Sequence, residues 1–285
     1  MSAPELGRVA RHVRPRSERR ATRWRVALLA LVAVLAGYVL MTLAARNASS
    51  PHPTLAAAWP AAPLVIAHRG GAGLWPESTR LGFDAARALG VDVLELDVHL
   101  ASDGELVVLH DDTVDRTTNG EGAVVTFTSE ALANLDAGVH WVVDGATPYA
   151  GLGQGVPRLV DVLADHPGVP MLIELKPDGE AAAVALCELL AETGRREDVV
   201  VGSFHAGALK AFRSACPQVA TGASPSEVRN FLILARLRLA GTYRPRFDVL
   251  QVPVRQGGIE IVTQSLISAA HAKGALLIVV VTETV

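Results

Sequence analysis

Short runs rich in β-branched residues alternate with Ala- and Leu-rich stretches of helical period through most of the chain after residue 63. Strands joined by helices in this way indicate βα units and a parallel sheet. The length of 285 residues suits one such domain, since α/β barrels commonly run to about 250 residues. The expected strands are Leu64–Ala67, Val93–Val98, Met171–Leu175, Val199–Ser203, Val219–Gly222, Asp248–Pro253 and Ala275–Val281. The clearest helices are Ser78–Leu89, Glu180–Glu192, Ala206–Ala215 and Gln264–Lys273.

One connection in this pattern is too short to join parallel strands. Only His99–Glu105 separate the strand Val93–Val98 from the next run, Leu106–His110, whereas a parallel crossover needs about a dozen residues. An Asp-Gly dipeptide within the connection is a turn signal, so we expect an antiparallel hairpin. The hairpin should bring His110 close to Asp97, with most of its second strand apart from the barrel wall.

The N-terminal part of the chain is expected to anchor it in a membrane. Residues 26–45 carry no charge, and as a helix rising about 1.5 Å per residue they span a hydrocarbon core of about 30 Å. A cleaved signal peptide is the alternative, but the apolar run is longer than a typical h-region and no A-x-A site directly follows it. The basic residues before the span are Arg8, Arg11, Arg14, Arg16, Arg19, Arg20, Arg23 and Arg25. The positive-inside rule therefore places residues 1–25 in the cytoplasm and the domain outside it, at the cell membrane.

These features divide the chain into a basic cytoplasmic tail (1–25), a transmembrane helix (26–45), a tether (46–63) and a large domain (64–285). The stretch from Asn47 to Pro63 is rich in Ser, Pro and Ala, which is typical of a flexible tether. The net charge of −3 argues against a nucleic-acid partner. We interpret the two cysteines, Cys187 and Cys216, as small buried apolar residues and expect no disulfide framework.

Polar side chains gather where the expected strands end, which is the catalytic rim of a (β/α) barrel. His68 and Arg69 end the first strand and precede two glycines. Glu95 and Asp97 are two residues apart on the second strand, so they point to the same face. Together with Glu174 on a later strand they would repel each other unless a cation neutralised them. Hard oxygen ligands of this kind suit Mg²⁺ or Ca²⁺.

Taken singly, each of these residues has an ordinary structural explanation. A histidine at a strand end is often only hydrogen-bonded, and a Glu-x-Asp pair is often the solvated face of a strand. Arg69 can pair with a surface acid, and Lys176, two residues after Glu174, can be a solvated lysine. Their joint placement at the ends of separate strands favours a functional site over these explanations.

The motifs around these residues resemble those of the glycerophosphodiester phosphodiesterase family. They are AHRGGAGLWPEST, DVLELDVHLASDGELVVLHDDTVDRTTNGEG, VPRLVDVL and MLIELKP, in the order and spacing of that family. The resemblance runs from about Leu64 to the C-terminus and weakens after Phe204. It implies a TIM-type (β/α)8 barrel that hydrolyses glycerophosphodiesters to glycerol 3-phosphate and an alcohol with the help of a divalent cation.

The resemblance also implies roles for individual residues. His68 and His110 would be the acid/base pair, with His68 favoured as base and His110 as acid. The cation ligands would be Glu95, Asp97 and Glu174.

Other positions follow from the same resemblance. Arg69 and Lys176 would hold the substrate phosphate. Glu77 would hold site residues in place without contacting the substrate itself. An insertion at about 113–155 would cover the site. The chain departs from the family at Ser78, where asparagine is usual.

Two further functions fit the same residues. A lysophospholipase D would hydrolyse the same bond in a single-chain lipid. An exposed apolar edge of the site on the Trp75 and Trp141 loops would favour this function. A catalytically dead barrel would only bind phosphorylated ligands. The presence of both histidines and all three acids argues against this last interpretation.

The C-terminal end gives one more expectation. The barrel strands predicted here number seven, whereas a closed barrel of this type has eight. We therefore expect a C-terminally truncated product of marginal stability. It should leave a gap between Leu64–Ala67 and Ala275–Val281, where unpaired strand edges would face each other.

Overall fold

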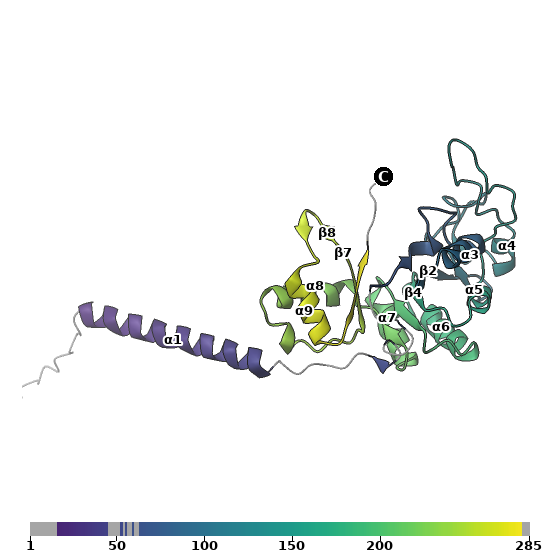
Figure 1. The fold of residues 1–285 in the computed structure, drawn as a ribbon. Helices are drawn as coiled ribbons and strands as arrows, with labels where there is room; N and C mark the ends of the chain where they lie inside the picture. Colours follow the sequence, from purple (N-terminus) through teal and green to yellow (C-terminus); the bar gives the residue numbers. More distant parts are fainter. Residues whose placement is uncertain (1–15, 45–51, 54, 56–58, 60–62, 281–285) are drawn as a thin grey trace, which may run out of the picture.

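A computed structural model of the protein describes residues 16–44, 52, 53, 55, 59 and 63–280. Helix α1 (Arg16–Ala44) projects from the domain as a separate rod (Figure 1). Its stretch Arg23–Leu43 has a mean hydropathy of 2.6, and none of it is buried against the domain. By length and composition this helix can cross a membrane, and a signal sequence would have the same properties.

Parallel strands form the centre of the domain. In spatial order the described ones are β1 (Ile66–Ala67), β2 (Val93–Leu100), β4 (Met171–Leu175), β5 (Val199–Gly202), β6 (Ala220–Thr221), β7 (Val249–Pro253) and β10 (Leu276–Val280). Neighbours in this order pair in parallel, and an isolated parallel bridge between Gly222 and Val249 joins β6 to β7. The predicted parallel α/β architecture is confirmed.

Helices follow most of these strands along the chain. They are α3 (Arg80–Ala88), α5 (Leu159–Asp165), α6 (Glu180–Glu192), α7 (Ala206–Ala215), α8 (Pro225–Arg236) and α9 (Gln264–Ala272), with short 3-10 turns η1 (His68–Gly70), η2 (Val124–Thr126) and η3 (Ala240–Thr242). Local signals set several of their starts. At α8, Ser224 and Glu227 form a capping box around Pro225 at the first turn. Thr79 and Thr263 cap α3 and α9 with their hydroxyl oxygens.

The predicted hairpin is present. β3 (Leu106–Val108) pairs antiparallel with the end of β2, with Val98 opposite Val108. The Leu109 N–H donates to the Asp97 carbonyl at 3.1 Å, so the residue that follows, His110, arrives beside the acids of β2. A short β8 (Arg255–Gln256) and β9 (Ile259–Glu260) form a second hairpin after β7.

The segment 113–155 folds against the first hairpin rather than into the barrel wall. Its helix α4 (Ser129–Ala133) is tied to the hairpin turn, because the Asp103 carboxylate accepts hydrogen bonds from the N–H and hydroxyl of Ser129. Its buried side chains, such as Val114 and Leu132, form a small core with Leu109 of the hairpin. The segment is thus positioned beside the end of β2, where the candidate site lies.

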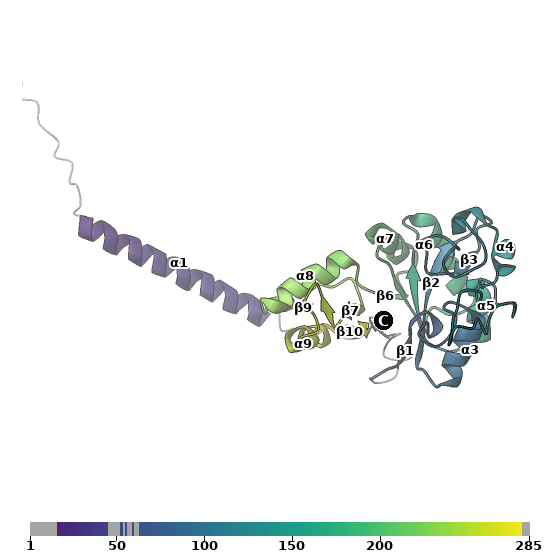
Figure 2. The same cartoon turned by 90° about the horizontal axis from the view of Figure 1, so that it is seen from above.

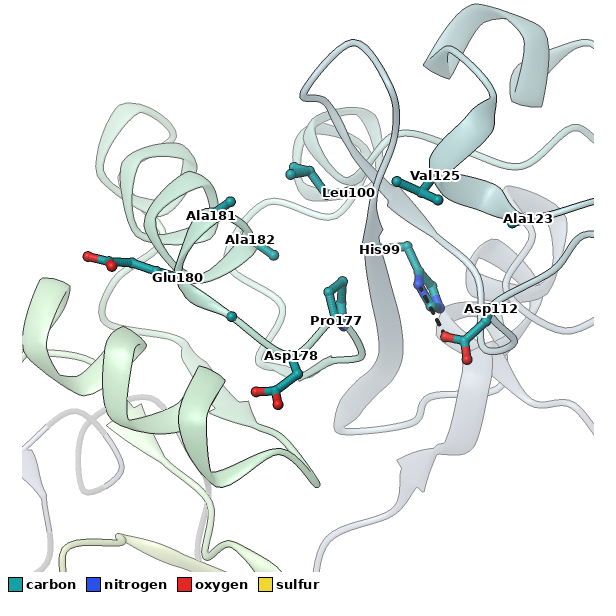
Figure 3. A pocket seen from close by; sticks show the side chains of 11 residues that line it. His99, Leu100, Asp112, Ala123, Val125, Pro177, Asp178, Glu180, Ala181 and Ala182 are labelled. Carbon is teal, nitrogen blue, oxygen red and sulfur yellow. Dashed lines mark ion pairs between the residues drawn. The ribbon is translucent and has the colours of Figure 1, made fainter.

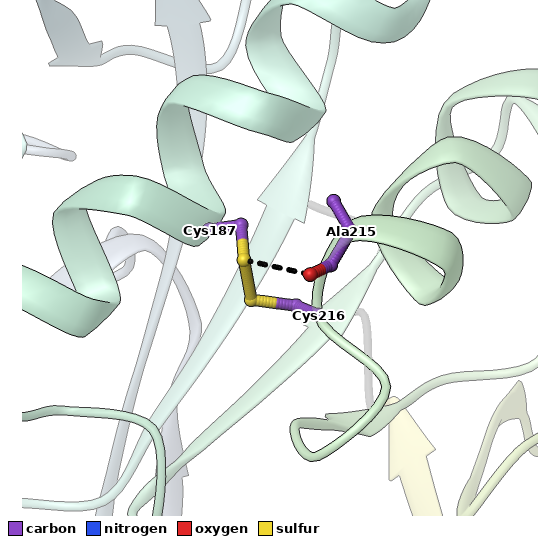
Figure 4. Close-up of a disulfide and its surroundings, with 3 residues drawn as sticks. All are labelled: Cys187, Ala215 and Cys216. Atoms are coloured by element: carbon purple, nitrogen blue, oxygen red, sulfur yellow. Dashed lines mark hydrogen bonds between the residues drawn. A yellow bond between two sulfur atoms is a disulfide. The ribbon is translucent and has the colours of Figure 1, made fainter.

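The two cysteines form a disulfide, which corrects the expectation of two small buried residues (Figure 4). Cys187 lies on α6 and Cys216 directly follows α7, and these two helices pack side by side. The sequence pattern does not reveal this packing, because the two residues are 29 apart. Disulfides persist in oxidising compartments, so the bond suggests that the domain lies outside the cytoplasm.

Removing this disulfide should lower the free energy of unfolding by roughly 3 kcal/mol, because it restricts an unfolded loop of moderate length. The check is thermal unfolding of Cys187→Ala/Cys216→Ala beside the unmodified chain, each with and without reductant. Reductant should lower the midpoint of the unmodified chain and leave that of the double variant unchanged. Equal midpoints in all four samples would contradict the prediction.

Two residues of the expected tether are packed into the domain. Leu55 and Trp59 are buried in a cluster with apolar side chains from the starts of the parallel strands. Val93 and Leu172 of this cluster lie two residues before acids of the candidate site, on the same faces of β2 and β4. The cluster is therefore the layer beneath the acids, towards the amino-terminal end of the barrel. At these two positions the idea of a flexible tether is wrong.

The first and last parallel strands do not pair with each other within the described residues. Instead, β1 and β10 line a cavity of about 510 Å³, with Ile66 and Ile278 among its walls. The cavity reaches His68 and Glu95. This agrees with the gap expected between these two strands.

Candidate active site

A strained turn after β1 begins the site. Arg69 has a left-handed backbone with φ of 51°, and Gly70 follows with φ of 73°. A Cβ at Gly70 would lie 2.8 Å from the Phe83 ring, so only glycine fits there. The bend points the Arg69 N–H at the Glu95 carboxylate, which accepts its hydrogen bond at 2.7 Å. Positive φ at a non-glycine residue is uncommon and concentrates at functional sites.

Three carboxylates converge at the end of β2 and β4. Asp97 lies opposite Glu174 in the sheet register, and Glu95 shares the face of Asp97. One oxygen from each lies within 4.8 Å of the others. Burial, together with the Asp97 charge, raises the pKa of Glu95 to about 8, and burial also raises the pKa of Glu174. Oδ2 of Asp97 is buried without a hydrogen-bond partner among the described residues. Ionisation of all three carboxylates together is therefore unfavourable in these surroundings.

Two cationic side chains contact this cluster. Lys176 Nζ lies 3.0 Å from Asp97 Oδ1 and 2.9 Å from Glu174 Oε1. Burial alone would lower the pKa of Lys176, but the Asp97 and Glu174 carboxylates together outweigh it and the pKa is raised. Arg69 Nε lies 3.7 Å from Asp97 Oδ2, and its Nη1 donates to Glu77 at 3.2 Å. Both side chains predicted to hold a phosphate are therefore charged and adjacent to the acids.

Two histidines approach from different elements. His68, at the end of β1, is half exposed, and its Nε2 lies 4.0 Å from Glu95. Burial, and next the charge of Arg69, lowers the pKa of His68. Nδ1 of His110 lies 2.6 Å from Asp111, and a proton placed on Nδ1 leaves Nε2 free for a ligand. A cavity of about 460 Å³ opens here between His110, Glu174 and Lys176.

The sequence model of the glycerophosphoryl diester phosphodiesterase family matches residues 68–283. The chain belongs to this family. It is 38% identical over 164 residues to the glycerophosphodiester phosphodiesterase of Caldanaerobacter subterraneus. It is 40% identical over 160 residues to the protein YhdW of Bacillus subtilis. These matches cover 56% and 55% of this chain but only 65% and 63% of the respective relatives, less than two thirds of their lengths.

Solved structures of the family share the fold. The glycerophosphodiester phosphodiesterase of Agrobacterium tumefaciens has a TM-score of 0.62 at 26% identity, covering 76% of this chain and 86% of that one. A phosphodiesterase of Oleispira antarctica, solved with the product sn-glycerol-3-phosphate, has a TM-score of 0.59 at 26% identity, covering 77% and 85%. The α/β fold of this chain therefore matches the barrel of these glycerophosphoryl diester phosphodiesterases.

The structure brings together every residue that the sequence predicted for the family's site: His68, Arg69, Glu77, Glu95, Asp97, His110, Glu174 and Lys176. Two further residues take part that the sequence reasoning did not assign, Asp111 and Arg116. Both lie in the HDD and RTT segments of the family motif, so their position in that motif was the available signal.

Arg116 connects the two sides of the site. Its guanidinium donates to Asp111 at 2.6 Å and to both oxygens of Glu77 at 2.7 and 2.9 Å. The hydrogen bond from Arg116 holds the pKa of Asp111 at about 2. Burial would raise the pKa of Glu77, but the hydrogen bonds and charges of Arg116 and Arg69 together outweigh it, and the pKa is lowered. A continuous charged network thus runs from His110 through these residues to Arg69.

Ser78, where the resemblance leads us to expect asparagine, lies at a position with an unusual backbone conformation. Ser78 has a left-handed φ of 58°, is buried, and donates its N–H to the Arg69 carbonyl at 2.9 Å. Its hydroxyl has no hydrogen-bond partner among the described residues. Asparagine tolerates this conformation better than most residues, which agrees with the asparagine that the resemblance leads us to expect here.

A second hollow of about 390 Å³ lies on the far side of the hairpin end (Figure 3). His99 and Asp112 face each other in it, with Nδ1 of His99 3.9 Å from the carboxylate. The other ring nitrogen lies 3.4 Å from the His110 carbonyl. Burial lowers the pKa of His99, so the neutral ring is favoured and can support the backbone of His110.

Proposed function

We propose that the domain hydrolyses glycerophosphodiesters to glycerol 3-phosphate and an alcohol. The observation that carries this proposal is the convergence of three carboxylates within 4.8 Å, flanked by His68 on one side and His110 on the other. Membership of the family and the product bound in the Oleispira antarctica relative support the same reaction.

The residues present fit a divalent cation. The oxygen of Asp97 that lacks a hydrogen-bond partner and the raised pKa of Glu95 both indicate a place where positive charge is needed. Glu95, Asp97 and Glu174 would hold Mg²⁺ or Ca²⁺, the cations that suit an all-oxygen ligand set. When bound, such a cation supplies positive charge to the phosphate oxygens.

Arg69 and Lys176 would stabilise the negative charge that develops on the phosphate during attack. His68 is suited to accept the proton of the attacking hydroxyl, because its lowered pKa keeps the ring neutral. His110 is suited to protonate the leaving alkoxide from Nε2, while Asp111 holds its Nδ1–H. The nucleophile is either water or a neighbouring hydroxyl of the substrate's glycerol; in the second case a cyclic phosphate forms as the alcohol leaves, and water then opens it to glycerol 3-phosphate.

The insertion at 113–155 would serve as a cap in this scheme. It supplies Arg116, which reaches across to Glu77, and its Ala123 and Val125 line the hollow beside the hairpin. Arg116 would position Asp111 and hence His110, without contacting the phosphate.

Turnover by the full chain in detergent tests the function directly. With Mg²⁺, glycerophosphocholine should release choline and glycerol 3-phosphate, each measured by a coupled assay. Release of choline from lysophosphatidylcholine alone would instead indicate a lysophospholipase D. The exposed side chain of Phe204, which lines the cavity beside His110, is a feature that supports this alternative. Trp75 gives that alternative little support, because it packs against the core. Cation binding without any turnover would indicate a dead barrel.

We also propose that α1 anchors the domain to the cell membrane and that the domain lies outside the cytoplasm. The apolar span, the preceding arginines and the disulfide support this arrangement.

Protease added to spheroplasts should therefore digest the domain and leave an epitope tag at the N-terminus protected. Immunoblots before and after lysis give the result, with a cytoplasmic protein as the control for intact cells. A domain that is protected until lysis would contradict this topology.

A further inference from the structure

A basic face lies on α8 and the connection that follows it to β7. Residues 229–246 contain five arginines and no acid, in a chain whose acidic residues outnumber its basic ones by 29 to 26. The arginines of this basic face are Arg229, Arg236, Arg238, Arg244 and Arg246. All five are exposed, and none forms an ion pair with an acid in the part of the chain that the structure describes. Their charge is therefore available to a partner.

The basic face also carries exposed apolar side chains. Leu237 is 55% exposed and Ile233 is 51% exposed, and both lie between arginines of the same segment. A surface that combines arginines with protruding aliphatic side chains has the chemistry of a segment that lies in a membrane interface.

The apolar helix α1 contacts this face. The Tyr38 hydroxyl donates to the Leu237 carbonyl at 3.1 Å, and α1 also touches η3. In Figure 2 the end of α1 lies next to the end of α8. Tyr38 is close to the C-terminal end of the apolar stretch Arg23–Leu43, where a spanning helix meets the water interface and tyrosine is enriched. A helix that spans the bilayer would therefore hold the basic face at the membrane surface.

We propose that the basic face rests on the anionic phospholipid surface of the bilayer that α1 spans. Leu237 and Ile233 enter the headgroup region, and the arginines bind lipid phosphates. The proposal rests on the anchoring role of α1 proposed above. Its occupant is a lipid surface because the membrane-spanning segment itself contacts this face, and because the charge of the face complements anionic headgroups.

This docking places the active site at the end of the barrel away from the docked connection. The connection from α8 to β7 lies at the amino-terminal end of the parallel strands, and Lys273, just before β10, donates to the Gly241 carbonyl there. The candidate catalytic residues lie at the opposite, carboxyl ends of β1, β2 and β4. The site therefore lies at the end of the barrel opposite the docked connection. The substrate class that fits this placement is a water-soluble glycerophosphodiester rather than a lysophospholipid embedded in the same membrane.

Hydrogen exchange of the full chain in nanodiscs tests the docking without requiring turnover. Backbone amides of residues 233–242 should exchange more slowly in discs containing phosphatidylglycerol than in discs of phosphatidylcholine alone. Arg244→Gln/Arg246→Gln should weaken the docking by roughly fivefold per arginine and reduce the difference between the two lipids. The matched control is Arg87→Gln/Lys210→Gln, which removes two exposed charges from α3 and α7 and should keep the difference.

Three results would overturn the proposal. The first is that residues 233–242 exchange at equal rates in both lipids. The second is that the two double variants show the same difference in exchange rate between the lipids. The third is that lipid-dependent protection appears at the hairpin end, residues 106–110, instead. The same discs, supplied with glycerophosphocholine in solution or with lysophosphatidylcholine in the bilayer, test the substrate class inferred from the placement of the site. Turnover of the embedded lipid alone would contradict it. Absence of all turnover would count against the proposed function and leave the exchange result standing.

Discussion

Replacing His68 or His110 with alanine should each lower kcat by about 10²- to 10⁴-fold, the range expected when a general acid or base is lost. The two residues reach the site from different elements, one from the end of β1 and the other from the hairpin, so neither can substitute for the other. The measurement is choline release from glycerophosphocholine at saturating substrate. Binding of the cation should survive in both variants, since the carboxylates are untouched.

His271→Ala is the matched control for these variants, because His271 is an exposed histidine on α9, away from the rim. It should retain the kcat of the unmodified chain. A kcat near that of the unmodified chain in His68→Ala or His110→Ala would remove that histidine from the mechanism. The variant Asp111→Asn separates positioning from catalysis, and it should lower kcat while leaving KM close to its original value.

Chelation should abolish turnover, and Mg²⁺ or Ca²⁺ should restore it. Glu95→Gln should reproduce the chelated state, because an amide removes one of the three charges that a cation would neutralise. Metal content after gel filtration gives a readout that is independent of activity, and it should fall in this variant. Full turnover in excess chelator would rule out the metal requirement.

The stability of Glu95→Gln distinguishes loss of the cation from misfolding. Without added cation the variant should unfold at a temperature no lower than the unmodified chain, because the raised pKa of Glu95 already favours the uncharged acid, which the amide imitates. Added cation should raise the midpoint of the unmodified chain only. Glu188→Gln, an exposed position on α6, is the matched control and should bind the cation normally.

Much of the fold followed from local pattern. The limits of β4, α6 and α7 are close to those predicted, because each is a strongly periodic segment bounded by residues that break the pattern. The hairpin was predictable because a seven-residue connection cannot cross over between parallel strands. The site residues were predictable because alternation along a strand places Glu95 and Asp97 on one face.

Other features depend on contacts between segments that are distant along the chain. Arg116 joins Glu77 to Asp111 only because the start of the insertion lies against the loop that precedes α3. The disulfide forms because α6 and α7 pack side by side. Trp59 is buried because the starts of several strands form an apolar layer beneath the acids.

The sequence by itself therefore determined the succession of strands and helices and the residues at the rim, since period, turn chemistry and motif spacing act over a few residues. Only the tertiary structure decided the disulfide, the buried tether residues, the charged network through Arg116 and the contact of α1 with Leu237 and η3. Each of these depends on the distance between segments that local patterns leave unspecified, and that distance is set by how the elements pack around one core.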